Sequence, residues 1–140
     1  MKSKFIFLLR ILVAVIFLQT LFLKFTGAKE SVYIFSTLGI EPWGRWLSGF
    51  AELIASILIL VPQTQVLGAL LAAGAMMGAI TSHLLVLGIV VEDDGGLLFG
   101  LACTVLISSL LILFLQRRLL LQMATKVHRC FCKSHQEGQS

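Results

Sequence analysis

Four long apolar segments dominate the chain and limit the folds that it can adopt. They run over residues 5–23, 46–61, 66–91 and 97–115. A helix that crosses the hydrocarbon core of a bilayer needs about 20 apolar residues, and these segments approach or exceed that length. Only 13% of the residues are charged, against about 25% in a typical soluble domain. The sequence therefore predicts an all-α fold, a transmembrane four-helix bundle surrounded by the lipid bilayer.

Two other interpretations of these segments are less favourable. Four strands are too few to close a membrane barrel, and an open sheet edge cannot be satisfied in lipid. The first segment has a basic start and an apolar core, as a signal peptide does. Its core is longer than usual for a signal peptide, however, and no clear small-residue cleavage site precedes Lys29. We expect it to be a retained membrane helix.

The basic residues predict the orientation of the bundle. If both termini lie inside, three basic residues face outward: Lys24, Lys29 and Arg45. Eight then lie on the inner side: Lys2, Lys4, Arg10, Arg117, Arg118, Lys126, Arg129 and Lys133. Cytoplasmic ends of membrane spans carry an excess of Lys and Arg, so N-in/C-in is predicted. The sequence pattern indicates neither a basic helix nor a recognised nucleic-acid-binding motif, and this argues against nucleic acid as a partner.

The longest connection between spans, residues 25–45, is too apolar for a free loop. It predicts a short amphipathic helix on the outer membrane surface between the first two spans, ending at Gly39. An irregular packed loop is the alternative. Tyr33, Trp43 and Trp46 are then expected near the outer interface, where aromatic rings with a polar edge accumulate.

Polar residues within the spans indicate a candidate site. Ionisable side chains inside a membrane are costly and usually face the bundle interior. With a rise of about 1.5 Å per residue, four polar residues fall at a similar height in the outer half: Gln19, Lys24, Glu52 and His83. We expect them to form one pocket that binds a polar head group or relays a proton, because a carboxylate can tune a histidine near neutral pH. The alternative is that Lys24, Glu52 and His83 only satisfy one another and fix the helix register.

Three further polar residues are expected to be structural. Ser48 and Ser56 lie four residues before and after Glu52, on the same stripe of the helix. Arg10 lies near the inner end of the first span, where its long side chain could reach lipid phosphates. We expect a structural role for it.

Residues 1–118 are expected to form the membrane domain and residues 119–140 a basic cytoplasmic tail. The tail holds four side chains that could bind a soft metal: His128, Cys130, Cys132 and His135. Their spacing differs from the usual zinc pairs, so a metal site is only a weak alternative, as is lipid attachment at the cysteines. A solvated tail with reduced thiols is the default expectation.

Five short motifs occur in a fixed order along the chain: Arg10, then Lys24-Phe25-Thr26-Gly27, Leu38-Gly39-Ile40, Gly49-Phe50-Ala51-Glu52 and Gly78-Ala79-Ile80-Thr81-Ser82-His83. Together they resemble the DoxX family of small four-helix bacterial membrane proteins, over roughly residues 5–115. The resemblance implies a bundle in the bacterial inner membrane. It also matches Arg10, Lys24, Glu52 and His83 to recurring polar positions of the family. The family is named after a subunit of an archaeal thiosulfate:quinone oxidoreductase, and some members associate with redox enzymes.

The leading functional hypothesis is an accessory membrane subunit of a redox or quinone-linked system, not an enzyme alone. Its pocket would accept a quinone-like head group; no other cofactor is evident. The sequence has no phosphate-binding glycine loop, no HExxH and no nucleophile elbow. Because only His83 lies in a span, a bis-histidine haem within one chain is excluded.

Two alternatives belong to other functional classes. The first is a small-solute carrier or channel subunit, which would need a homo-oligomer because four helices enclose little space. The interface between its subunits would be the Gly- and Ala-rich segment 66–91, where Gly74 and Gly78 form a small-xxx-small pair. The second is a scaffold that anchors a soluble partner through the basic tail.

Overall fold

The computed structural model of the chain describes the backbone of residues 1–137 and the side chains of residues 1–129. Over this range the chain is helical, with no strand. The elements are α1 (Lys2–Thr26), α2 (Lys29–Thr37), α3 (Trp43–Leu60), α4 (Gln65–Ser82), the π-helical turn η1 (His83–Leu87), α5 (Leu97–Leu115) and α6 (Arg117–Glu137). The predicted all-α fold is confirmed.

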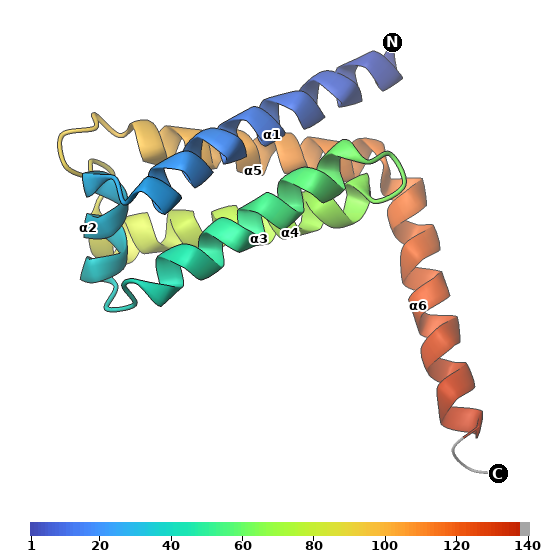
Figure 1. The fold of residues 1–140 in the computed structure, drawn as a ribbon. Helices are drawn as coiled ribbons and strands as arrows, with labels where there is room; N and C mark the ends of the chain where they lie inside the picture. The colour runs from blue at the N-terminus through green and yellow to red at the C-terminus, as the bar shows by residue number, and fades with distance from the viewer. Residues whose placement is uncertain (138–140) are drawn as a thin grey trace.

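Four of these elements are long and apolar enough to cross a membrane: α1, α3, α4 with η1, and α5. They pack side by side as a bundle in which α3 lies between α1 and α4, and α5 contacts both α4 and α1. The N-terminus and α6 lie at one end of the bundle, and α2 lies at the other (Figure 1). The predicted four-helix transmembrane bundle is therefore confirmed, and both termini leave it on the same side.

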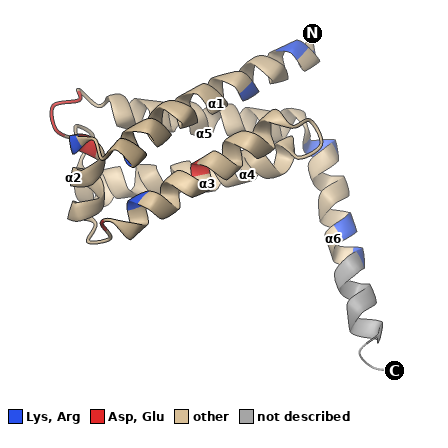
Figure 2. Cartoon of the chain, in the orientation of Figure 1, with Lys and Arg blue, Asp and Glu red and all other residues tan. Residues whose placement is uncertain are grey.

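The interior of the bundle is packed tightly. Val13, Phe17, Ile59, Val105 and Ile112 are almost completely buried in it. Many other large apolar side chains point outward and are exposed, among them Leu12, Phe22, Ile54, Leu110 and Phe114. Figure 2 shows the charged residues gathered mainly toward the ends of the bundle, with few along its length. This arrangement suits a bundle surrounded by lipid, where apolar side chains need no cover from water.

Glycine permits a close contact between two helices, but at a position that the sequence did not single out. A Cβ atom at Gly68 of α4 would lie 2.7 Å from Cα of Ile59 in α3. Only glycine lets the two backbones approach so closely. At Gly74 and Gly78, the small-xxx-small pair, a Cβ would meet nothing within 4 Å. That pair therefore makes no close contact with another helix among the described residues.

Two arginines tie α1 to α3. The Arg10 side chain of α1 donates from Nε to the carbonyl oxygen of Ile59 at 2.6 Å, and from Nη2 to that of Leu60. In the opposite direction, Arg45 of α3 donates from Nη1 to the carbonyl oxygen of Lys24. The last carbonyls of a helix lack partners within the helix, so each arginine satisfies the end of the other helix. Arg10 thus turns into the bundle and does not extend toward lipid phosphates.

The third span is shorter than predicted. The sequence suggested residues 66–91, but the regular helix ends at Ser82 and the π-turn ends at Leu87. Gly88 follows with a φ of 81°, and its amide donates to the His83 carbonyl oxygen at 2.7 Å. Glycine readily adopts this positive φ, so the helix ends here and the apolar residues after it belong to a loop.

The acidic loop between η1 and α5 is organised by Asp94. Its Oδ1 accepts hydrogen bonds from the amides of Val91 and Gly96, both at 2.9 Å, and its Oδ2 accepts one from Leu98 at 3.0 Å. Burial alone would raise the pKa of Asp94, but the three amides and the nearby His83 outweigh it and hold the pKa below its ordinary value. The ionised carboxylate thus holds the loop to the start of α5.

The tail, for which no secondary structure was predicted, is helical. Helix α6 begins at Arg117, directly after α5, and turns away from the bundle (Figure 1). His128 lies on its exposed surface. The side chains of Cys130, Cys132 and His135, the other weak metal candidates, lie outside the described residues. Among the side chains of residues 1–129, no group of three His, Cys, Asp or Glu could hold a metal ion.

Candidate functional site

A cavity of about 410 Å³ opens at the α2 end of the bundle. Residues of α1, α2, α3, α4, η1 and α5 line it, so each spanning helix contributes to its walls. Most of the lining is apolar, including Ile34, Leu38, Ala79, Leu87 and Ala102. The polar groups of the site therefore stand in a largely apolar chamber.

Helix α2 covers this chamber. Gly27, with a φ of 67°, ends α1 in a left-handed conformation and lets the chain turn sharply into α2. Gly39, with a φ of 72°, follows the end of α2. The short helix predicted between the first two spans is thus present and stops where expected. Ser31 and Phe35 are the buried residues of α2, and both line the cavity.

Glu52 of α3 carries the negative charge of the site. Only 3% of its surface is exposed, and its Oε1 forms an ion pair with Nζ of Lys24 in α1. The hydroxyl of Thr20, also in α1, donates to Oε2 at 3.1 Å. Lys24 in turn lies 6.0 Å from the centre of the Phe35 ring. A buried carboxylate is tolerated because it is paired and hydrogen-bonded in this way.

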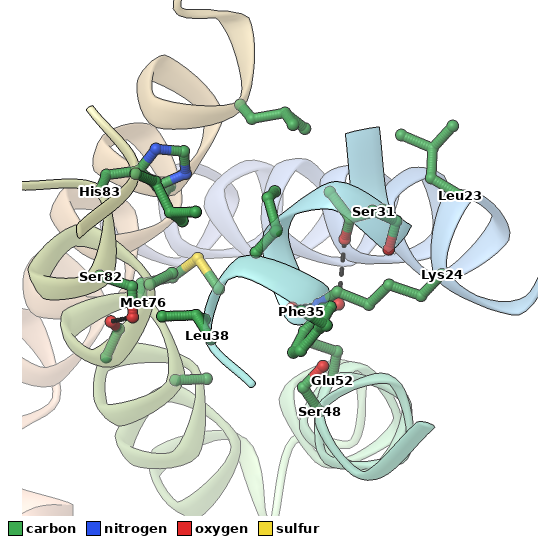
Figure 3. A pocket seen from close by; sticks show the side chains of 18 of the residues that line it. Leu23, Lys24, Ser31, Phe35, Leu38, Ser48, Glu52, Met76, Ser82 and His83 are labelled. Atoms are coloured by element: carbon green, nitrogen blue, oxygen red, sulfur yellow. Dashed lines mark hydrogen bonds and ion pairs between the residues drawn. The ribbon is translucent and has the colours of Figure 1, made fainter. Parts of the chain in front are cut away.

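His83 lies on the opposite side of the cavity, at the start of η1. Figure 3 shows its imidazole across from Glu52, with Leu38 and Met76 between the two. Its Nδ1 lies 2.9 Å from the carbonyl oxygen of Gly88. A carbonyl can only accept, so Nδ1 carries a proton, and in the neutral form of the ring Nε2 is then an acceptor. Among the described residues, no hydrogen bond or ion pair joins His83 to Glu52; the positive charge of a protonated His83 acts instead on Asp94, whose pKa it helps to lower.

The structure brings three of the four predicted pocket residues to one cavity: Lys24, Glu52 and His83. Gln19 is the exception, because its side chain is exposed and does not line the cavity. Successive residues of an α-helix point about 100° apart, so a correct depth does not guarantee a correct direction. The inward position belongs to Thr20, the next residue, which bonds Glu52.

The two serines that flank Glu52 bond to backbone. Ser56 is buried, and its hydroxyl donates to the carbonyl oxygen of Glu52 at 2.8 Å. Ser48 donates to the carbonyl oxygen of Arg45 at 3.0 Å and lines the cavity. Neither has a recorded bond to the carboxylate. Their hydrogen bonds fit the structural role expected for them.

Sequence reasoning missed Ser31 of α2. Only 6% of this residue is exposed, and its hydroxyl has no hydrogen-bond partner among the described residues. It lines the cavity (Figure 3). A buried hydroxyl without a partner is unfavourable unless something else satisfies it. Its position four residues before Phe35, on one face of a short helix, could have revealed it.

A model of the DoxX family matches residues 5–88, which is more than half of the chain. The chain belongs to the DoxX family. This DoxX segment contains Lys24, Glu52 and His83 and ends before α5 begins. No curated protein and no solved structure matches the chain. Membership of the DoxX family and four apolar helices together identify a multi-pass membrane protein.

Proposed function

We propose that this DoxX protein is an accessory subunit of a redox system in the bacterial inner membrane, and that its cavity binds the head group of a quinone-like lipid. The observation that carries the proposal is the unpartnered hydroxyl of Ser31, buried beside an ion pair in a largely apolar cavity. A ligand that brings both an apolar ring and hydrogen-bonding oxygens would satisfy such a site.

Size and chemistry of the cavity support a ring of this kind. Ligand sites commonly have volumes of about 300–1,000 Å³ and place a few polar groups in apolar walls. The cavity has about 410 Å³. A quinone ring is flat and apolar, and its two carbonyl oxygens accept hydrogen bonds from opposite sides. When bound, a quinone supplies reversible transfer of two electrons and two protons.

The polar side chains divide into donors and an acceptor. Ser31 can donate its hydroxyl proton, and the ammonium of Lys24 has protons besides the one directed to Glu52. Both can hold a carbonyl oxygen. His83, across the cavity, offers Nε2 as an acceptor for a hydroxyl, because Nδ1 is engaged by Gly88. Donors on one side of the cavity and an acceptor on the other suit a quinone, whose oxygens change between carbonyl and hydroxyl when it is reduced and oxidised.

The ion pair itself favours a binding role over simple packing. Burying two charges costs free energy, and well-packed apolar side chains often hold helices together equally well. Lys24 and Glu52 stand at a cavity wall, where their charges can act on a ligand. The purely structural alternative explains the pairing but not the cavity beside it.

A solute carrier is the less supported function. Below the cavity, the bundle is filled by almost completely buried side chains, including Val13, Ile59 and Ile112. This packing disfavours a polar path through one copy of the chain. The cavity therefore fits a binding site at one end of the bundle better than a passage.

The test measures binding of short-chain benzoquinones and naphthoquinones to the full-length chain in lipid nanodiscs. Loss of one hydrogen bond in Ser31→Ala should weaken binding about fivefold. Ser109→Ala is the matched control, because Ser109 also has a buried hydroxyl without a described partner but does not line the cavity. Equal affinities for the wild type and both variants would reject the site. For the redox role, membranes lacking the chain should lose quinone-dependent electron transfer, and only the wild-type chain should restore it.

A further inference from the structure

We propose that α6 lies along the membrane surface at the end of the bundle opposite α2 and binds anionic lipid head groups. The proposal does not depend on the function of the cavity. It rests on three features of α6: the distribution of its side chains, its direction relative to the bundle and its position at the end of a membrane span.

Helix α6 has one basic face. Arg118, Gln122, Lys126 and Arg129 follow one another at spacings of four, four and three residues, so they share one side of the helix. All four are exposed. No Asp or Glu occurs between residues 117 and 129 to neutralise them. The face therefore presents concentrated positive charge.

The opposite face is apolar. Leu120, Met123 and Val127 also follow helical spacing, and they lie away from the basic stripe. Val127 is 69% exposed. Helix α6 turns away from the bundle after its junction with α5 (Figure 1), so the bundle leaves most of this apolar face uncovered. Amphipathic helices with basic and apolar faces lie in membrane interfaces, with the apolar face in the acyl chains.

The geometry places α6 at that interface. Helix α5 is a membrane span that ends at Leu115, and α6 begins two residues later at Arg117. The Arg117 guanidinium lies 5.4 Å from the centre of the Phe114 ring at this junction. From there α6 runs across the axis of the bundle and does not continue it (Figure 1). A helix that leaves the bilayer and turns across the bundle axis lies along the membrane surface.

Charge complementarity identifies anionic lipid as the binding partner of the basic face of α6. The start of α6 is already at the edge of the bilayer, so lipid head groups are the first groups that its basic face meets. Basic segments beside a membrane span are attracted to anionic head groups over about one Debye length. A soluble acidic protein could match the basic face but would leave the apolar face uncovered.

The test is amide hydrogen exchange of residues 117–129 in the full-length chain, reconstituted in nanodiscs of phosphatidylcholine with or without phosphatidylglycerol. Exchange should be at least about fivefold slower with the anionic lipid. The variant Arg118→Gln/Lys126→Gln/Arg129→Gln should lose this difference. The control Lys2→Gln/Lys4→Gln/Lys29→Gln removes the same charge elsewhere and should keep it. Exchange of residues 1–115 reports whether the bundle of each variant is folded.

High salt gives a second measurement on the wild-type chain, because it should reduce the effect of the anionic lipid. Equal exchange in both lipids would overturn the proposal. Fast exchange in both lipids that slows only when other membrane-associated proteins are present would also overturn it, and would assign α6 to a protein partner.

Discussion

Arg10 of α1 and Arg45 of α3 perform the same task at opposite ends of one antiparallel helix pair. Arg10 donates to the final carbonyl oxygens of α3, and Arg45 donates to the carbonyl oxygen of Lys24 near the end of α1. Two such points fix how far α1 can slide along α3. Lys24 and Glu52, one on each helix, are thereby held at the same height, where they can form their ion pair.

Replacing Arg10 by methionine should destabilise the bundle. Methionine keeps much of the length of the side chain but leaves the carbonyl oxygens of Ile59 and Leu60 without their donor. We expect the free energy of unfolding in detergent micelles to fall by about 1–3 kcal/mol. Lys4→Met, at an exposed position of the same helix, is the control and should change it little. Equal stability of the two variants would contradict the bonding described for Arg10.

The ion pair gives a test that separates stability from binding. Glu52→Gln leaves the Lys24 ammonium buried without its counterion, and removal of one partner of a buried pair typically costs about 3–5 kcal/mol. The double variant Lys24→Met/Glu52→Leu removes both charges and should regain most of this stability. Unfolding measurements on the three chains check this. If the pair also serves the proposed ligand, the stable double variant should still fail to bind quinone; full binding would leave the pair a structural role only.

The depth of the polar residues could be predicted from the sequence, but their direction could not. Counting the helical rise placed Lys24, Glu52 and His83 at a similar height, and all three line one cavity. The same count could not show that Thr20, and not Gln19, points toward Glu52, because one residue along a helix changes the direction by about 100°.

Contacts that depend on the packing of α2 could not be predicted from the sequence either. No hydrogen bond or ion pair joins His83 to Glu52 among the described residues, so the expected pairing does not occur; the two side chains lie on opposite sides of the cavity (Figure 3). Which side chains α2 inserts depends on how it packs over the bundle end. Helix α6 was missed for another reason. Its charges suggested a solvated tail, although its basic residues and its apolar residues each recur at helical spacing and form separate faces.

Two glycines of α4 should respond oppositely to the same substitution. In Gly68→Ala, the new Cβ would lie 2.7 Å from Cα of Ile59 and would force α3 and α4 apart. We expect a loss of about 1–3 kcal/mol in unfolding free energy. In Gly74→Ala, the Cβ meets open space, and alanine favours a helix over glycine by about 1 kcal/mol. Thermal unfolding should therefore show a lower midpoint for the first variant and an equal or higher one for the second.

Asp94 should make the stability of the chain depend on acidity. Its pKa in the folded chain lies below the ordinary value of 3.8, since the amides of Val91, Gly96 and Leu98 overcome the effect of burial. A carboxyl group whose pKa is lower in the folded state stabilises that state above its unfolded pKa. This stabilisation is lost as the pH falls through the folded pKa. The wild type should thus exceed Asp94→Asn in stability near neutral pH, and the difference should shrink below pH 3.8.

The neighbouring Asp93 supplies the control for this prediction. It lies in the same loop with a φ of 62°, a conformation that asparagine also adopts, and no group among the described residues forms a hydrogen bond to its carboxylate. Unfolding midpoints measured from pH 3 to pH 7 should therefore be nearly the same for Asp93→Asn and the wild type. The Asp94→Asn midpoint should converge on them only at the acid end. A constant difference across the whole range would mean that ionisation of Asp94 contributes nothing to holding the loop against α5.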